Sequence, residues 1–385
     1  MKIKDNIFYV GVNDHKIDLF EGHYYLPGGI AYNSYVIMDE KIAVMDSVGE
    51  DFSEEWLANI KAVCGDRQPD YIIVQHMEPD HSRNITAFME AYPDAVVVAS
   101  AKAWPMMEAF NGSKYEGRNL TVAEGDTLNL GKCNLKFIAA AMVHWPEVIM
   151  TYEETTKTFF SADAFGKFGA LDYDDPEGWD CEARRYYFGI VGKYGVQVQG
   201  LLKKAATLDI QTICPLHGPV LTENLEHYLK QYNTWSSYGV ETDGVAIFYT
   251  SVYGNTKKAV LMLEEKLLAA GCPKVAVTDL ARDDWAEAVE DAFRYGKIVL
   301  ATTTYNGDMF PEMKSFINHL EERNWQNKKV AFIENGSWGP VAAKKMKSAV
   351  EGLKNLEFID PVVTIKSALN DANEKAIDEL VEILK

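Results

Sequence analysis

Seven side chains that can bind metal ions lie in four short stretches of the first part of the chain. The densest stretch is YIIVQHMEPDH, residues 71–81, where four of them fall within six residues. The other three occur singly in VHWPE, SADAFG and PLHGP. The candidate ligands are His76, Glu78, Asp80, His81, His144, Asp163 and His217. Seven ligands that converge on one place are enough for two metal ions.

The mixture of ligand types indicates which metal would bind. A hydrolytic zinc site prefers nitrogen and sulfur, whereas four imidazoles with three carboxylates shift the preference toward iron or manganese. The three negative charges also favour oxidised metal ions, which carry more positive charge than two ferrous ions. The composition therefore predicts a redox-active di-iron centre. His15, His227 and His319 are isolated in the sequence, and we interpret them as structural residues.

Each candidate ligand follows a segment whose apolar pattern predicts a strand. A strand end can fix the direction of a ligand while the loop after it leaves room for a substrate. The four strands are expected at Tyr71–Val74, Leu135–Ala141, Thr158–Ala162 and Ile210–Cys214. Further elements are expected around them: the hairpin arms Tyr35–Met38 and Ile42–Asp46, the strands Val148–Tyr152 and Ala95–Ala99, and helices over Ser53–Cys64 with Ser53 as N-cap, Asn84–Ala91 and Arg184–Ala206.

A second candidate site begins at YTSVYGNT, residues 249–256, between a predicted strand and a predicted helix. Backbone N–H groups at a helix N-terminus, together with Ser and Thr hydroxyls, suit a phosphate. The stretch has neither GxxxxGK[ST] nor GxGxxG, so a monophosphate fits better than a triphosphate or a dinucleotide. Two further loops, TTTYNGDMFP and ENGSWGP, bring Tyr305 and Trp338 to the same sheet edge, where aromatic faces can sandwich a flat ring.

Strands and helices alternate in the second part of the chain, which predicts an open, doubly wound parallel sheet. The polar and aromatic stretch YNTWSSYGVETD, residues 232–243, carries the predicted domain boundary, and the domains are expected at residues 1–240 and 241–385. The five strands are expected at Val245–Tyr249, Lys274–Asp279, Ile298–Thr302, Lys329–Glu334 and Pro361–Lys366, with helices over Thr256–Ala270, over Glu312–Arg323 and from Asp371 onward.

Length and charge narrow the classes of function. A chain of 385 residues exceeds what one core usually supports, so two domains are expected. The formal charge of −19 argues against nucleic acid or an anionic membrane as a partner. The five cysteines are scattered and never spaced as CxxC, which predicts reduced thiols and no rubredoxin-type iron module. Neither a signal peptide nor a membrane span is recognisable, and we expect a cytoplasmic protein.

HMEPDH resembles the metal motif H-x-E-x-D-H of the flavodiiron proteins, a branch of the metallo-β-lactamase fold in which Glu replaces the second His of the hydrolases. VHWPE, SADAFG and PLHGP match the later ligand positions of that family. The resemblance implies two groups of ligands with Asp163 bridging them, namely His76, Glu78 and His144 on one iron and Asp80, His81 and His217 on the other. Tyr194, in GKYG, is a candidate proton donor, with a buried structural tyrosine as the alternative. The segment DLFEGHYYLPGGIAYNSYVI departs from the commoner family pattern, which has a His beside the Gly and more polar residues after it.

The three loops of the second part together resemble flavodoxin, whose cofactor is FMN. The resemblance implies that the first loop holds the phosphate and that the other two surround the flavin ring. The expected FMN contacts are Thr250, Ser251, Tyr253, Gly254, Asn255, Thr256, Thr304, Tyr305, Asn306, Gly307, Asn335, Gly336, Ser337, Trp338 and Gly339.

The resemblance covers essentially the whole chain and implies an α/β fold, with a metallo-β-lactamase-like αββα sandwich followed by a flavodoxin-like, doubly wound parallel five-stranded sheet. The implied activity is reduction of O2 to water, of NO to N2O, or of both, with two non-haem irons and one FMN per subunit. The implied partners are an external electron donor, such as rubredoxin or a reduced deazaflavin, and further copies of the chain in a head-to-tail homodimer or a dimer of dimers. The alternatives are a zinc hydrolase with a flavodoxin docking domain and a pure electron carrier.

Overall fold

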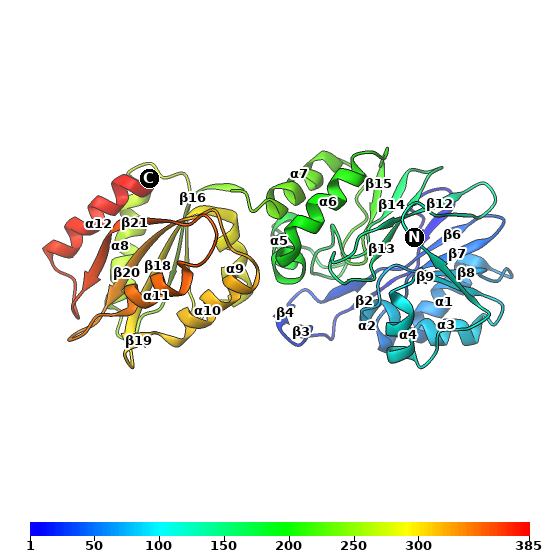
Figure 1. Ribbon diagram of the computed structural model, residues 1–385, viewed down its shortest axis with the longest axis horizontal. Helices are drawn as coiled ribbons and strands as arrows, with labels where there is room; N and C mark the ends of the chain where they lie inside the picture. Colours follow the sequence, from blue (N-terminus) through cyan, green and yellow to red (C-terminus); the bar gives the residue numbers. More distant parts are fainter. The chain divides into compact units, whose positions relative to one another are not determined.

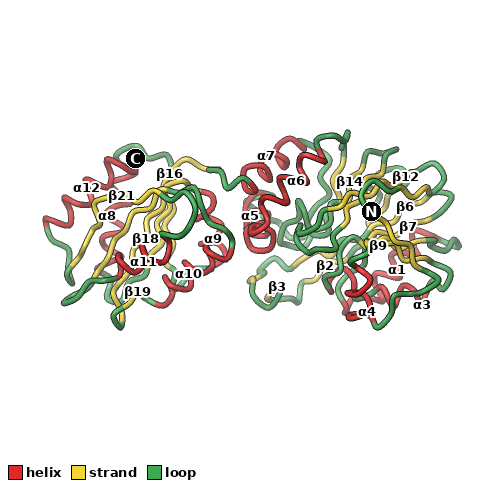
Figure 2. Tube along the Cα trace, in the orientation of Figure 1, coloured by secondary structure: helices red, strands yellow, loops and turns green.

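The computed structural model describes residues 1–385, which form two compact units (Figures 1 and 2). The first unit comprises Met1–Tyr187 and Val196–Tyr232, and the second comprises Phe188–Gly195 and Asn233–Lys385. Helix α7, Leu225–Ser236, runs into the stretch in which the sequence places the domain boundary. The boundary at residues 240 and 241 itself stays a prediction.

The first unit contains two large sheets. One sheet has the order β1-β6-β7-β8-β9-β10, in which β7, β8, β9 and β10 are parallel. Its strands are β1 (Ile7–Tyr9), β6 (Tyr35–Met38), β7 (Ile42–Met45), β8 (Tyr71–Val74), β9 (Val96–Ser100) and β10 (Asn119–Val122). The other sheet has the order β11-β12-β13-β14-β15. Its strands are β11 (Thr127–Asn129), β12 (Asn134–Ala139), β13 (Ile149–Glu153), β14 (Thr158–Phe160) and β15 (Thr212–Cys214).

A core between the two sheets holds this unit together. Ile37, Met45 and Ile73 from the first sheet pack in one apolar cluster with Phe137 and Phe160 from the second, and all five are fully buried. Burying a large apolar side chain stabilises a fold by roughly 1.5–3 kcal/mol, so this layer is a large part of what fixes the two sheets. These core side chains therefore hold together the two sheets whose strand ends carry the candidate ligands.

Helices cover the outer faces of the sheets (Figure 1). On the first sheet these are α1 (Ser53–Cys64), the short α2 (Pro79–Ser82), α3 (Ile85–Ala91) and α4 (Ala103–Asn111). The spacing of apolar residues in the sequence predicts α1 and α3. In the structure, Trp56 of α1 lies against Phe88 of α3, with 5.9 Å between ring centroids. On the second sheet, Lys204 of α6 (Gly195–Ala205) donates from Nζ to the carbonyl of Ala139 at the end of β12, 2.8 Å away. Two small hairpins complete the unit: β2 (Val12–Asp14) with β5 (Ile30–Tyr32), and β3 (Leu19–Phe20) with β4 (Tyr24–Tyr25).

The second unit is an open parallel sheet with the order β17-β16-β18-β20-β21, as the alternation of strands and helices predicts. Its strands are β16 (Thr242–Tyr249), β17 (Val275–Asp279), β18 (Tyr295–Tyr305), β20 (Lys329–Asn335) and β21 (Glu357–Ile365), and the short β19 (Asp308–Met309) pairs with β18. Helices α8 (Asn255–Ala269) and α12 (Asp371–Leu384) share an apolar core with one face of the sheet. The other face lies under α9 (Trp285–Arg294), α10 (Pro311–Glu322) and α11 (Ala342–Val350) (Figure 1).

Most predicted elements are confirmed, and two details are wrong. Ser53 is the first residue of α1 and forms no side-chain cap, because the turn Glu50–Phe52 leads directly into the helix. The helix expected over Arg184–Ala206 is broken into α5 (Asp180–Tyr186), a π-helical turn at Tyr187–Val191, a 3-10 turn at Gly192–Tyr194, and α6. A Cβ atom at Gly195 would lie 2.5 Å from the carbonyl oxygen of Ser236, so this close approach requires glycine.

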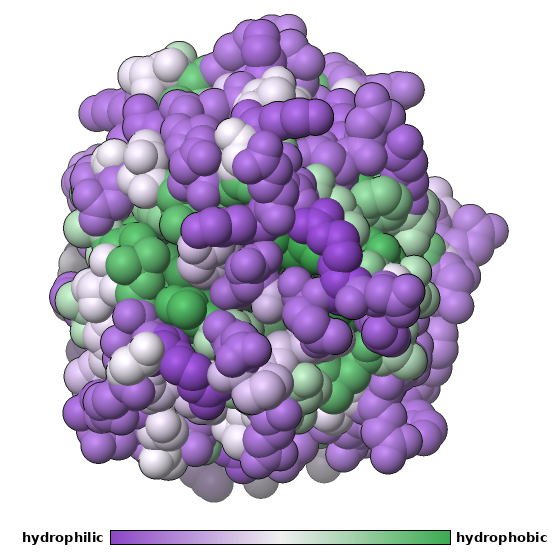
Figure 3. Space-filling model, turned by 90° about the vertical axis from the view of Figure 1, so that its right-hand side faces the viewer, coloured by the Kyte–Doolittle hydropathy of each residue, from purple (hydrophilic) through white to green (hydrophobic).

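The face of the molecule shown in Figure 3 is mostly hydrophilic, with hydrophobic residues in smaller groups between the polar ones. None of the helices combines the length and the apolar character needed to cross a membrane.

Candidate metal cluster and flavin pocket

The candidate metal ligands follow the ends of four strands. Strands β12 and β14 are each antiparallel to β13, and β15 is parallel to β14, so β12, β14 and β15 all run in the same direction. The residues after them, His144, Asp163 and His217, consequently meet at one edge of the second sheet. The stretch after β8 in the first sheet supplies the remaining four candidates, and two of these, Asp80 and His81, lie on the short helix α2.

Four of the side chains form the first half of the cluster: His76, Glu78, His144 and Asp163. The Nε2 atoms of His76 and His144 lie 3.2 and 3.0 Å from Oε2 of Glu78. Both Nε2 atoms also lie 3.1 Å from Oδ2 of Asp163. Two nitrogens and two oxygens thus face one small volume.

The second half contains Asp80, His81 and His217. The Nε2 atoms of the two histidines are 3.0 Å apart, and they lie 3.1 and 3.3 Å from Oδ2 of Asp80. The other carboxylate oxygen of Asp163, Oδ1, lies 3.3 Å from Nε2 of His81 and 3.8 Å from Nε2 of His217. Asp163 therefore lies between the two halves and presents one oxygen to each.

The cluster has the chemistry of a metal site. Both carboxylate oxygens of Asp80 and of Asp163 are buried without a hydrogen-bond partner, although imidazole nitrogens lie close to them. Buried anionic oxygens without partners are costly, and a cation among them removes that cost. The donors are oxygen and imidazole nitrogen with no thiolate, which fits iron better than a structural zinc ion. The seven residues therefore fit two iron ions.

Mutual stabilisation of opposite charges dominates the electrostatics of the cluster. Burial disfavours the charged form of His81, but the carboxylates of Asp80 and Asp163 raise its pKa to about 10. Burial likewise opposes charge on His144, and Asp163 and Glu78 raise its pKa to about 9. Burial and the charge of Asp80 oppose ionisation of Glu78, yet the two neighbouring histidines lower its pKa to about 2. A metal ion that enters the cluster must consequently displace protons from imidazoles.

Residues outside the predicted set hold the ligands in place. His217 donates from Nδ1 to the carbonyl of Ala31, 2.8 Å away, and Asn33 donates to the carbonyls of Pro215 and Gly218 on either side of it. Near β8, Asp46 accepts hydrogen bonds from the backbone and side-chain nitrogens of Gln75 at 2.7 and 2.8 Å. None of these residues carries a sequence signal, because their role depends on which strands are neighbours.

Glu147 is a further residue that the sequence does not single out. It is buried, and its Oε1 lies 2.8 Å from Nδ1 of His76 and 2.9 Å from the backbone nitrogen of Met77. Its only signal is its place in VHWPE, three residues after His144.

Two groups near the cluster have raised pKa values. In the segment that departs from the family pattern, desolvation and then the charge of Glu78 raise the pKa of Glu21 to about 8. The buried ring of Tyr186 lies 5.5 Å from that of His217, and burial, followed by the charge of Asp163, raises the pKa of its phenol well above the usual value. The predicted proton donor Tyr194 is half-buried in the 3-10 turn of the second unit, and its role stays a prediction.

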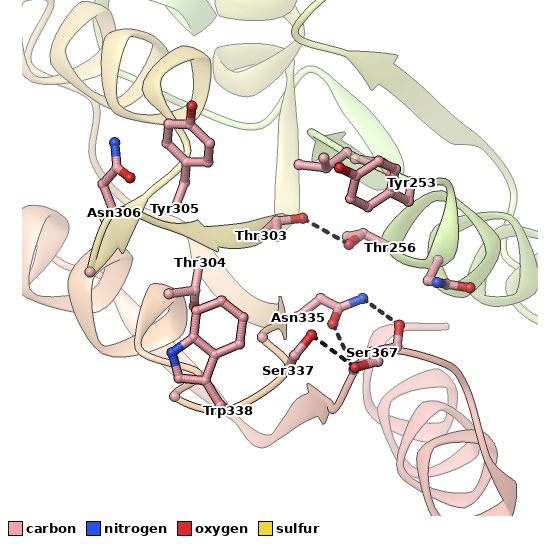
Figure 4. A pocket seen from close by; sticks show the side chains of 16 residues that line it. Tyr253, Thr256, Thr303, Thr304, Tyr305, Asn306, Asn335, Ser337, Trp338 and Ser367 are labelled. Atoms are coloured by element: carbon pink, nitrogen blue, oxygen red, sulfur yellow. Dashed lines mark hydrogen bonds between the residues drawn. The ribbon is translucent and has the colours of Figure 1, made fainter.

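The second unit contains a cavity of about 510 Å³ at the carboxyl ends of its strands. The three predicted loops line it, as Figure 4 shows. Its lining comprises Ser251, Val252, Tyr253, Asn255, Thr256, Thr303, Thr304, Tyr305, Asn306, Gly307, Asn335, Gly336, Ser337, Trp338, Gly339 and Ser367. Of the expected contacts, Thr250 and Gly254 are outside this lining, since Thr250 is buried in a hydrogen bond with Thr302. Val252, Thr303 and Ser367 line the cavity without having been predicted.

Hydrogen bonds fix the backbone of the loops, while the aromatic side chains at the rim of the cavity are exposed to solvent. Ser251 accepts hydrogen bonds at Oγ from the backbone nitrogens of Gly254 and Lys257 at the start of α8. Tyr253 and Trp338 project at the rim and are 93% and 96% exposed (Figure 4). Exposed aromatic surface around a cavity marks a binding site, and a flat ring between these side chains would cover it. Two hydroxyl-bearing side chains at the base, Thr256 and Thr303, suit a phosphate.

Comparisons with known proteins agree with this architecture. Residues 30–218 match the family model "ODP family beta lactamase", and residues 246–358 match the model "Flavodoxin domain". An uncharacterised protein of Methanocaldococcus jannaschii is 30% identical over 97% of this chain and 95% of its own length. The nitric oxide reductase of Moorella thermoacetica is 28% identical over 94% of this chain and 92% of its own.

Among solved structures, the rubredoxin oxygen:oxidoreductase of Desulfovibrio gigas superposes with a TM-score of 0.91 at 24% identity, over 100% of this chain and 97% of that one. The similarity confirms the predicted fold class, a β-lactamase-like domain followed by a flavodoxin domain. The chain belongs to the flavodiiron proteins, an oxidoreductase family whose cofactors are FMN and a non-haem di-iron centre.

Proposed function

We propose that this oxidoreductase reduces O2 to water, NO to N2O, or both, at a di-iron centre held by the seven clustered residues. Reduction of O2 to two water molecules takes four electrons and four protons, and reduction of two NO molecules to N2O and water takes two of each. A site with two metal ions and a nearby flavin can supply several electrons in succession. The name of the Moorella relative supports NO as a substrate, and that of the Desulfovibrio protein supports O2.

The observation that carries the proposal is the place of Asp163 between the two halves of the cluster. Oδ2 faces His76 and His144, and Oδ1 faces His81 and His217. A carboxylate with one oxygen toward each of two metal positions supports binding of a pair of ions. The oxygen-rich donor set supports iron in both positions.

The residues around the cluster orient the ligands and exclude water. The ring of Trp145 stands edge-on to His76, with 5.2 Å between centroids, and Phe20 stands edge-on to His217 at 5.4 Å. Apolar rings beside the ligands limit the access of water and strengthen electrostatic interactions among the ligands, and such surroundings suit an uncharged diatomic gas. We retain Tyr194 as the candidate proton donor, and Tyr194→Phe tests it through the rate of gas reduction in a protein with unchanged iron and flavin content.

FMN in the cavity of the second unit would accept electrons from an external donor and pass them on one or two at a time. The name of the Desulfovibrio protein supports rubredoxin as the kind of donor, and a reduced deazaflavin is the alternative. If rubredoxin reduces FMN at a rate that depends on salt concentration, the donor is a charged protein. If only a reduced deazaflavin reduces FMN, at a rate independent of salt, the deazaflavin takes the place of rubredoxin as the donor.

We further propose a head-to-tail homodimer, or a dimer of dimers, in which FMN of one subunit serves the irons of another. Mixing Asp163→Asn subunits, which lack the central ligand, with subunits made unable to bind FMN tests this arrangement. Recovered activity in mixed dimers supports transfer between subunits. No recovery in dimers that are shown to have exchanged subunits contradicts it.

Anaerobic single-turnover reduction tests the function. The purified protein is analysed for iron and FMN, fully reduced, and then exposed to O2 or NO in separate runs while flavin oxidation is followed and products are identified. Rapid flavin oxidation with formation of water or N2O is expected, and the faster gas is the preferred substrate. Zinc in place of iron, with a flavin that reacts with neither gas at a catalytic rate, would overturn the proposal in favour of a hydrolase.

A further inference from the structure

Glu147 is a buried carboxylate that lies behind the metal cluster and is absent from the ligand set. It follows His144 by three residues in the loop between β12 and β13, and only 2% of its surface is exposed. Its Oε1 contacts Nδ1 of His76 and the backbone nitrogen of Met77 at 2.8 and 2.9 Å. Its backbone carbonyl accepts a hydrogen bond from Oγ of Ser100 on β9, 2.7 Å away, so the loop is anchored to the other sheet.

The hydrogen bonds of Glu147 determine the tautomer of His76. A carboxylate only accepts hydrogen bonds, so Nδ1 of His76 is the donor to Oε1. The lone pair of the neutral ring is then on Nε2, which is the nitrogen that faces Glu78 and Asp163 at 3.2 and 3.1 Å. Glu147 therefore turns the metal-binding nitrogen of His76 toward the site.

Packing alone does not explain a carboxylate here. The second oxygen of Glu147, Oε2, is buried without a hydrogen-bond partner. An unpartnered buried polar atom costs about 1–3 kcal/mol, and an apolar side chain of similar size would avoid that cost. The carboxylate orients the His76 ring and places a negative charge beside it, and these two effects offset the cost of the unpartnered oxygen.

The second half of the cluster has no equivalent of Glu147. His217 also donates from Nδ1, but its acceptor is the uncharged carbonyl of Ala31. His81 has a buried Nδ1 without a hydrogen-bond partner. Another buried carboxylate, Asp46, lies near His81 and His76, yet it is hydrogen-bonded to Gln75 and to neither histidine. Of His76, His81 and His217, His76 is the one whose Nδ1, on the side away from the cluster, is bonded to a carboxylate.

We propose that Glu147 is a positioning residue that makes the two metal positions unequal, so that the iron held by His76, Glu78 and His144 is oxidised first. A carboxylate bonded to Nδ1–H makes the imidazole a stronger electron donor, which favours the ferric over the ferrous ion. In the one-electron step, a chemical oxidant such as ferricyanide takes one electron from this iron, and the iron held by His81 and His217 stays ferrous. The inference rests on the proposed assignment of the seven residues as iron ligands.

Two substitutions of Glu147 separate its charge from its hydrogen bonds. Glu147→Gln keeps an amide oxygen that can accept from both His76 and Met77 but removes the negative charge. Glu147→Leu removes both the charge and the hydrogen bonds. The matched control is Glu153→Gln, because Glu153 is a buried carboxylate of the same unit that accepts from the backbone nitrogens of Thr155 and Thr156 and is hydrogen-bonded to no histidine.

The measurements are iron content, Mössbauer spectra of protein loaded with isotopically enriched iron, and the potentials of stepwise anaerobic oxidation. We expect Glu147→Gln to keep both irons while its first oxidation requires a stronger oxidant and the two iron sites become harder to distinguish. We expect Glu147→Leu to weaken iron binding about 10- to 100-fold. Glu153→Gln should leave the potentials and spectra unchanged.

Unchanged potentials in Glu147→Gln, with wild-type iron content, would overturn the inference while leaving the di-iron assignment intact. A potential shift of equal size in Glu153→Gln would also overturn it, because any buried carboxylate would then act alike. A wild-type protein that binds no iron would overturn both the inference and the proposed function. If Glu147→Leu does not fold, the comparison between the two glutamine variants still decides the question.

Discussion

The metal cluster and the flavin pocket are built in opposite ways. His76, His81 and Asp163 are fully buried, and further residues behind them fix their directions. At the flavin pocket, by contrast, Tyr253 and Trp338 are almost fully exposed, and hydrogen bonds within the loops fix the backbone while leaving these rings uncovered. The first site is completed by the chain itself apart from the ions, whereas the second presents surface that its ligand must cover.

This difference predicts where each site gains its affinity. The metal cluster concentrates seven charged or ionisable groups in a dry volume, so single substitutions there have large effects. The flavin pocket distributes binding over three loops and many neutral contacts, so single substitutions there have modest effects. Four experiments follow from this contrast.

Asp163→Asn should have the largest effect. It removes the charge that lies between the two halves of the cluster, and we expect the affinity for both irons to fall by about 100-fold or more. FMN binding should be unchanged. Iron analysis and the flavin absorbance of the same sample give both results. The control is Asp70→Asn, which changes a carboxylate of the same unit that accepts from the backbone nitrogen of Ile42; equal iron loss in the two variants would show a general structural effect instead.

The affinity of the metal-free protein for a divalent ion should fall as the pH falls. The neighbouring carboxylates raise the pKa values of His81 and His144 to about 10 and about 9, against the effect of burial. At neutral pH both rings therefore carry protons that the ion must displace, and each displaced proton weakens binding about tenfold per pH unit. Titration with cobalt(II) in buffers between about pH 7 and pH 8.5 should show this slope, together with proton release in calorimetry. A flat profile would contradict the protonated cluster, and FMN affinity over the same range provides the contrast.

Trp338→Ala should weaken FMN binding about tenfold. The exposed indole can stack on a flat ring, and such contacts contribute about 0.5–1.5 kcal/mol beyond the surface they bury. Fluorescence quenching of FMN by the flavin-free protein measures the change, and iron content should stay the same. Ile383→Ala is the control, because Ile383 is an exposed apolar residue of α12 outside the pocket. An effect of Trp338→Ala no larger than that of the control would remove Trp338 from the flavin site.

Thr304→Val should have the smallest effect. Oγ1 of Thr304 accepts hydrogen bonds from the backbone nitrogens of Val341 and Ala342 at 3.0 and 3.2 Å, and so caps the start of α11. Loss of this cap should lower the free energy of unfolding by about 1 kcal/mol and weaken FMN binding a few-fold. Thr304→Ser keeps the hydroxyl, so its free energy of unfolding and its FMN affinity should equal those of the wild type. If the serine variant behaves like valine, shape and not the hydroxyl decides the local stability.

Predictions from the sequence succeeded where the signal was local. The strands β8 and β20 and the helices α3 and α10 follow their apolar periodicity closely, because burial of one face selects one periodicity in each segment. The prediction failed over residues 184–206, where several glycines and the close approach of Ser236 to Gly195 interrupt the helix. This contact joins residues that are far apart in the sequence, so no local sequence pattern predicts it.

The sequence by itself determined the kinds of ligand, their order along the chain and the strands that precede them, since side-chain chemistry and hydrophobic spacing are properties of short segments. The tertiary structure decided what lies behind the ligands: Glu147 behind His76, the carbonyl of Ala31 behind His217, and the two separate oxygens of Asp163 between the halves of the cluster. These contacts depend on strand direction and sheet packing. The same donor set would bind no pair of metal ions if the strands that carry it ended at different edges.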